Sequence, residues 1–196
     1  INISEGNTFT MSKNVTTTRM DINGTVTAEG NITAAITMGN DGILNLNTLT
    51  NASGTQAANV TGVIQSGVID TNQGTLSING TWGTSAEIGT GGRGLDAIYL
   101  GANGNSTSAF TTTFGHSVNA TTITLGTATS SLNSTLVIQS DVRGVNTVIT
   151  GDIVGGGNSS STDNKAGGRL LISGNATVTG SIGISGGRLA DIRIED

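Results

Sequence analysis

Short runs of alternating apolar and polar residues recur along the whole chain. A period of two is typical of a β-strand that buries one face. Clusters of Gly, Asn and Ser, such as Asn23-Gly24 and Asn79-Gly80, separate the runs and predict turns. No segment carries an apolar stripe of helical spacing, so the sequence predicts an all-β fold. The clearest alternating pairs are Ile36 and Met38, Leu44 and Leu46, Leu76 and Ile78, Ile98 and Leu100, Ile123 and Leu125, Leu136 and Ile138, and Ile192 and Ile194.

A segment of this pattern occurs twice, 94 residues apart. The run Gly74-Thr-Leu-Ser-Ile-Asn-Gly80 matches Gly168-Arg-Leu-Leu-Ile-Ser-Gly174, and the match continues without a gap to Leu100 and Ile194. Weaker similarity extends upstream, with the extra residues of the second copy around 155–167. We therefore expect two repeat units of about 95 residues, 1–97 and 98–196, with the second ending on the first strand of a further unit.

Two architectures accommodate such repeats, a parallel β-solenoid and a pair of β-sandwich domains. We favour one continuous right-handed β-solenoid, because a narrow solenoid core needs few large rings and aromatic residues make up only 3% of the chain. Alternation then places Ser77, Tyr99 and Arg193 outward. The residues expected inward are Leu76, Ile78, Ile88, Ile98 and Leu100, with their counterparts Leu170, Ile172, Ile182, Ile192 and Ile194.

Composition narrows the classes of protein. The chain has 196 residues, of which 33 are Thr, 20 Asn and 31 Gly, with no Pro or Cys. The absence of Cys excludes disulfide scaffolds and cysteine-ligated zinc. A net charge of −5 with only eight Lys and Arg residues argues against a nucleic-acid partner. No apolar run is long enough for a membrane helix, so we expect no membrane insertion by this segment.

The run from Gly168 to Glu195 resembles the repeated element of rickettsial-type autotransporter passengers, the outer-membrane protein B-like surface antigens. Val178, Gly180, Ile182 and Gly183 supply the middle of that pattern. The first copy departs from it around Trp82-Gly83-Thr84, where the Val-Thr-Gly of the family is missing. The resemblance covers about 27 residues twice, and it implies a β-helical passenger on a cell surface with an adhesive or protective role. It implies no catalytic residue.

Candidate chemistry is sparse. His116 beside Ser117 is more simply a polar turn, and no nucleophile or nucleotide motif is present, so we expect no enzyme and no cofactor. Oxygen ligands at Asn40-Asp41-Gly42 and Asp163-Asn164 leave calcium open. Trp82 has Ala176 at its matching position in the second copy, and with Tyr99 it is the candidate ligand contact.

Three functions remain. The first is a non-catalytic, extracellular adhesin or coat segment that binds a host-cell or other surface receptor. The second is a filament subunit whose terminal strands join copies of the chain head to tail; the candidate assembly residues are Ile1, Ile3, Ile192 and Ile194. The third is a carbohydrate-active β-helix enzyme, which would need two carboxylates within reach of one bond. Asp70, Asp96, Asp152 and Asp191 fall near predicted loops, but nothing in the sequence marks two of them as partners, so no catalytic residue is assigned.

Overall fold

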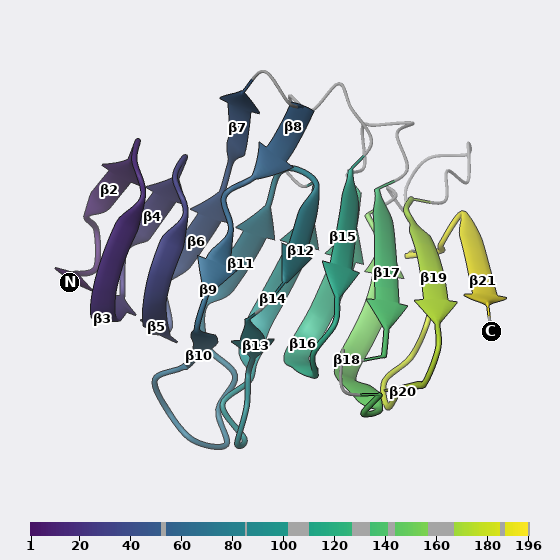
Figure 1. Cartoon of the computed structure of the whole chain (residues 1–196). Helices are drawn as coiled ribbons and strands as arrows, with labels where there is room; N and C mark the ends of the chain where they lie inside the picture. The colour runs from purple at the N-terminus through teal and green to yellow at the C-terminus, as the bar shows by residue number, and fades with distance from the viewer. Residues whose placement is uncertain are drawn as a thin grey trace.

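The computed structural model describes residues 1–51, 54–84, 86–101, 110–126, 134–140, 144–156, 167–184 and 187–195. Within these ranges the chain is all-β and contains no helix. Figure 1 shows that chain order follows the long direction of the molecule, with the N-terminus at one end and the C-terminus at the other. The prediction of an all-β fold is confirmed.

The strands are short, and most contain Thr, Val, Ile or Leu, whose shapes suit a pleated surface. Their bounds are β1 Asn2–Ile3, β2 Thr8–Met11, β3 Val15–Ile22, β4 Thr25–Ala28, β5 Ile32–Met38, β6 Ile43–Leu46, β7 Thr48–Asn51, β8 Gly54–Ala57, β9 Val60–Thr61, β10 Val63–Ser66, β11 Thr75–Ile78, β12 Trp82–Thr84, β13 Glu87–Ile88, β14 Leu95–Leu100, β15 Thr111–Phe114, β16 Val118–Leu125, β17 Thr135–Gln139, β18 Thr147–Gly155, β19 Arg169–Ser173, β20 Ala176–Val178 and β21 Asp191–Glu195.

Among the described residues, the strands form three sheets. The largest has fourteen strands and is nearly closed and barrel-like, with the order β1-β3-β5-β10-β13-β16-β14-β11-β6-β4-β2 and with β9, β18 and β20 joined to this path. The second has the order β12-β15-β17-β19-β21. All strand pairs described in these two sheets are parallel, whereas the hairpin β7-β8 and the isolated bridge between Ile184 and Gly187 are antiparallel.

Parallel pairing in register aligns apolar side chains from successive strands into ladders. Because register partners on neighbouring strands point to the same face, each rung covers the next. The longest ladder runs through Val26, Leu44, Leu76, Ile98, Ile123 and Ile153, all buried. A second ladder in the smaller sheet runs through Thr112, Leu136, Leu170 and Ile192.

Most of the predicted inward positions are buried. Leu76, Ile78, Ile88, Ile98 and Leu100 all lie in the core, and so does Leu170. Ile172 and Ile182 are partly buried. The prediction was wrong for Ile192 and Ile194, which are 51% and 77% exposed. Both belong to β21, which pairs with β19 and lies at the end of the smaller sheet, so their outer side is uncovered by any described strand.

The 94-residue correspondence relates strands with the same local pattern in different sheets. Leu76 lies on β11 of the larger sheet and pairs with Ile98, whereas Leu170 lies on β19 of the smaller sheet and pairs with Ile192. The two copies therefore share the same pairing between strands, but their strands lie in different sheets. The predicted boundary between units at residues 97 and 98 falls inside β14 (Leu95–Leu100).

Two of the three predicted outward side chains are exposed. Tyr99 is 37% exposed, and Arg193 extends from β21 with its side chain in solvent. Ser77 was expected to be outward but is buried. It lies in register between Asn45 and Tyr99, so two larger neighbours in the same row flank its small side chain.

Hydrogen bonds from backbone N–H groups to Asn side chains stabilise some of the turns between strands. The Asn31 backbone N–H donates to Asn14 Oδ1 over 2.9 Å, and the Asn59 N–H donates to Asn31 Oδ1 over 3.0 Å. These bonds satisfy backbone groups where the strand ladder is interrupted. Close backbone approach also fixes one glycine: Gly151 has φ +130, and a Cβ there would collide with the Ala120 carbonyl oxygen.

Candidate ligand-binding groove

Three neighbouring parallel strands present an outward surface of polar side chains. Ile88 of β13, Val118 of β16 and Ile149 of β18 are register partners, and all three are buried. Alternation therefore directs the residues on either side of them outward. One outward row contains Glu87, Ser117 and Val148, and the other contains Gly89, Asn119 and Thr150.

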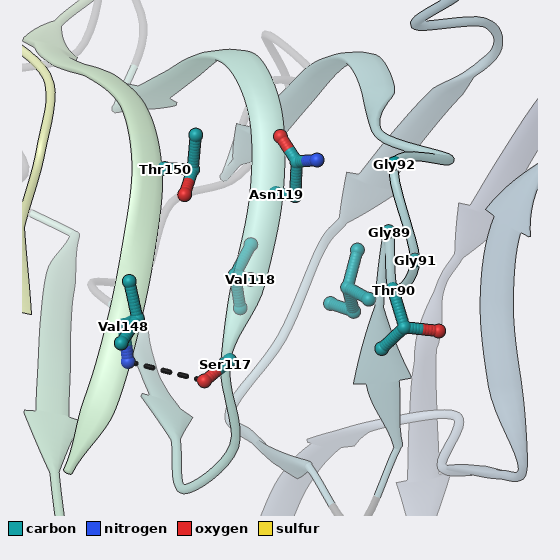
Figure 2. A pocket seen from close by; sticks show the side chains of 10 residues that line it. Gly89, Thr90, Gly91, Gly92, Ser117, Val118, Asn119, Val148 and Thr150 are labelled. Carbon is teal, nitrogen blue, oxygen red and sulfur yellow. Dashed lines mark hydrogen bonds between the residues drawn. The ribbon is translucent and has the colours of Figure 1, made fainter. Parts of the chain in front are cut away.

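A recess of about 290 Å³ opens on this surface. Figure 2 shows Val148 and Thr150 of β18 on one side, Ser117 and Asn119 in the middle, and the turn at residues 89–92 on the other side. Ligand pockets in proteins are commonly about 300–1,000 Å³, so this recess alone is just below that range.

Glycine conformations shape the turn that bounds the recess. Gly89, Gly91 and Gly92 have φ of +71, +62 and +74, a left-handed backbone that residues with a Cβ rarely adopt. A Cβ on Gly89 would also collide with the Asn119 carbonyl oxygen. The turn is held from outside by the Asp70 N–H, which donates to the Gly92 carbonyl over 2.8 Å.

Arg93 fixes the same turn to the preceding loop. Its Nη1 donates to the carbonyl oxygens of Ser66 and Gly67, over 3.3 and 2.9 Å. A charged donor with two carbonyl acceptors gives stronger hydrogen bonds than a neutral donor. The wall of the recess is thus held in place by hydrogen bonds that are made outside the recess.

Several polar side chains of the recess have hydrogen-bonding capacity that the described residues of the protein leave unsatisfied. Ser117 Oγ accepts a hydrogen bond from the Val148 N–H over 3.1 Å, which leaves the hydroxyl proton for another acceptor (Figure 2). Within the part of the chain that the structure describes, the side chains of Thr90, Asn119 and Thr150 have no hydrogen-bond partner. The recess therefore offers three hydroxyls and one amide to a ligand.

A second recess of about 210 Å³ continues from the first. The two recesses share Thr90 and Ser117, and the second adds Glu87, His116, Val145, Asn146 and Thr147. We refer to the two together as the β16 groove. Asn146 Nδ2 donates to Thr177 Oγ1 over 2.8 Å, which fixes the amide at the far end.

The sequence-predicted ligand contacts do not lie together. Trp82 is on β12 of the smaller sheet and is 2% exposed, within the hydrophobic core, whereas Tyr99 is on β14 of the larger sheet. Trp82 Nε1 is buried without a hydrogen-bond partner. Neither residue lines the β16 groove. Trp82 presents almost no surface to a ligand.

The predicted assembly strands have different environments. Ile3 is buried on β1, which pairs with β3, and the Ile1 ammonium group donates to the Arg19 carbonyl over 3.0 Å. Ile192 and Ile194 lie on β21 and are 51% and 77% exposed, so Ile3 of the N-terminal strand is covered whereas the C-terminal pair is not.

The predicted calcium ligands are only partly within the described residues. Asn40 and Asp41 line a recess of about 380 Å³ that also includes Glu5 and Asn23. Asp163 and Asn164 lie outside the described residues. In the described part of the chain, no three His, Asp or Glu residues form a group that could hold a metal ion. Calcium binding stays a prediction.

The four carboxylates considered for catalysis are dispersed over the fold. Asp70 lies in the turn between β10 and β11, Asp96 is on β14, Asp152 is on β18, and Asp191 is on β21 of the smaller sheet. Asp152 Oδ1 accepts from the Ser181 N–H over 2.8 Å, and Asp191 forms an ion pair with Arg193 at 2.9 Å. The structure brings no pair of them into the β16 groove.

Comparison with protein-family models, with curated proteins and with solved structures finds no match to this chain. Among the described residues there is also no helix with the length and apolar character needed to cross a membrane.

Proposed function

We propose that this chain is a non-catalytic segment of an extracellular surface protein, an adhesin or coat segment like an autotransporter passenger. It forms a right-handed parallel β-solenoid. The observation that carries the proposal is the in-register parallel pairing, in which aliphatic side chains form continuous buried ladders while Thr, Ser and Asn occupy the outer positions. Such a surface is polar, weakly charged and built from repeated elements.

This architecture suits display and adhesion. A stack of parallel strands presents the same outward rows on successive strands, so contacts with a partner can be repeated along its length. The chain carries a net charge of −5, with only eight Lys and Arg residues. A partner is then recognised by hydrogen bonding and shape more than by strong electrostatic attraction.

An adhesion assay tests the proposal. Beads coated with the purified chain are expected to be retained on host-cell layers or on purified extracellular matrix under flow. Beads coated with heat-unfolded chain provide the matched control, because they carry the same composition without the folded surface. Retention equal to that of albumin-coated beads on every surface tried would overturn the proposal.

A second candidate is a filament subunit, favoured by the exposed ends of the strand order. Ile192 and Ile194 are exposed on β21, and Phe9 is 42% exposed on β2 at the opposite end of the molecule. A strand from another copy that paired with β21 would continue the existing parallel ladder. The intact mass of the native protein separates a segment of a longer chain from an independent subunit.

Sedimentation velocity tests this candidate directly. Ile194→Lys places a charge on the exposed edge and is expected to abolish concentration-dependent association. Ile69→Lys is the matched control, since Ile69 is also exposed but lies in a loop. If the unsubstituted chain stays monomeric at all concentrations, the filament function is excluded.

A further inference from the structure

We propose that the β16 groove binds a neutral glycan chain. This inference rests on the proposed function, because a surface protein meets glycans on the structures to which it adheres. To that function the inference adds the class of ligand and the residues that bind it. The observation behind it is the set of polar side chains in the groove that no described residue satisfies, namely those of Thr90, Asn119 and Thr150.

The chemistry of these groups matches sugar hydroxyls. A hydroxyl of a sugar both donates and accepts, and the Asn119 amide offers two N–H donors and one carbonyl acceptor. Thr90 and Thr150 each donate and accept through a hydroxyl, and Ser117 retains its hydroxyl proton. Val148, which is partly exposed on β18, supplies an apolar contact of the kind that the C–H face of a sugar ring needs.

The charge of the described lining residues disfavours an acidic glycan. Among the residues that the structure describes, no Lys or Arg lines either recess, whereas Glu87 lines the second one. Asp70 lies behind the turn, with its Oδ1 2.9 Å from where a Cβ on Gly92 would be. Arg93 also lies at this turn and, like Asp70, lines neither recess, so among the described lining residues a sulfate or carboxylate would meet the Glu87 carboxylate and no Lys or Arg.

The groove also does not suit an added peptide strand. Strand addition needs an edge with unpaired backbone N–H and C=O groups. β16 is paired on one side with β13 and β14 and on the other with β18, so it is not an edge strand. The groove lies on the outer face of these strands and presents side chains.

The polar row continues beyond the groove and sets the direction of the ligand. Asn119 and Thr150 are register partners on β16 and β18, and Thr179 follows β20 one position after Val178, which pairs with Ile149. Neighbouring strands are about 4.8 Å apart, close to the length of one sugar ring. A glycan chain that crosses the strands would place successive rings over successive members of this row.

Calorimetric titration of the purified chain tests the inference. The probes are neutral gluco-, manno- and N-acetylglucosamine oligosaccharides of increasing length, with a heparin oligosaccharide as the anionic counterpart. Saturable binding to a neutral series is expected, with affinity that rises with chain length and then levels off. Asn119→Ala and Thr150→Val are each expected to weaken binding about tenfold.

Two matched controls keep the result specific to the groove. Asn45→Ala removes an amide from β6, and Thr124→Val removes a hydroxyl from the other end of β16; neither residue lines the groove. Both are expected to bind like the unsubstituted chain. Circular dichroism and thermal melting establish that every variant is folded, which is expected because the Asn119 and Thr150 side chains make no hydrogen bond to a described residue.

Three results would overturn the inference. The first is that no neutral glycan binds, and the second is that the Asn119→Ala and Thr150→Val variants bind as well as the controls. The third is that heparin binds more tightly than the neutral series. The bead assay distinguishes the two proposals. If adhesion survives both substitutions, the groove is not the site of adhesion, but the proposed surface function still stands. Release of shortened sugars during the titration would instead contradict the non-catalytic function and keep the groove as a site.

Discussion

Replacing Leu76 by Ala should have a large and predictable cost. Leu76 is fully buried on β11, between Leu44 and Ile98 in the longest ladder. The substitution removes three carbon atoms, worth about 2.4 kcal/mol at roughly 0.8 kcal/mol for each buried carbon. Four register pairs hold β11 on each side, so the backbone cannot move inward to fill the space. The residual cavity raises the expected loss to about 3–4 kcal/mol.

Urea unfolding, followed by circular dichroism and by tryptophan fluorescence, measures this loss. Trp82 is the single tryptophan of the chain and is buried in the same core, so its emission reports on core exposure. The thermal midpoint should fall by about 10 °C. Coincident transitions from the two probes are needed before one free energy of unfolding is assigned.

The matched control is Ile192→Ala, a ladder position in the smaller sheet that is half exposed. Its expected cost is about 1 kcal/mol or less, since half of the side chain is in water before the change. The reasoning is refuted if the two substitutions cost the same, or if Leu76→Ala costs under about 1 kcal/mol.

Two further predictions concern the backbone. Gly151→Ala should destabilise the fold by more than about 2 kcal/mol in the same urea assay, because its positive φ and the Ala120 carbonyl leave no room for a Cβ. Gly144→Ala is the control, with a positive φ but open space, and should cost only about 1 kcal/mol. Asn31→Ala removes the acceptor of the Asn59 N–H and should cost about 1–2 kcal/mol, with faster hydrogen exchange at that amide by NMR; unchanged exchange there would contradict this hydrogen bond.

The alternation of residues was enough to predict most strands and their buried faces. The pairs around Leu76 and Ile98 lie on strands and point into the core, as their spacing predicts. What alternation could not predict is the sheet to which a strand belongs. Leu76 and Leu170 have the same local surroundings in sequence but lie in different sheets, because both sheets require the same pattern of one buried and one exposed face.

The candidate groove was even harder to predict. Asn119 and Thr150 are 31 residues apart, and they become neighbours only because the intervening chain brings β18 beside β16 in one register. The length of that intervening chain is set by loops, which tolerate insertions at small cost. Trp82 stands out because the second copy has Ala176 at its matching position, but such a difference between copies does not distinguish a ligand contact from a core residue.

Parallel pairing between nearby segments has a kinetic consequence. Val26 and Leu44 are 18 residues apart, and Ile98 and Ile123 are 25 apart. In these pairs the search for a partner therefore spans 18–25 residues of chain, and the relative contact order falls as a chain built from such short-range pairs lengthens. Each completed strand also offers the next one a template with its hydrogen-bonding groups already aligned. A chain that emerges from one end first can fold as it arrives, without waiting for its last residue.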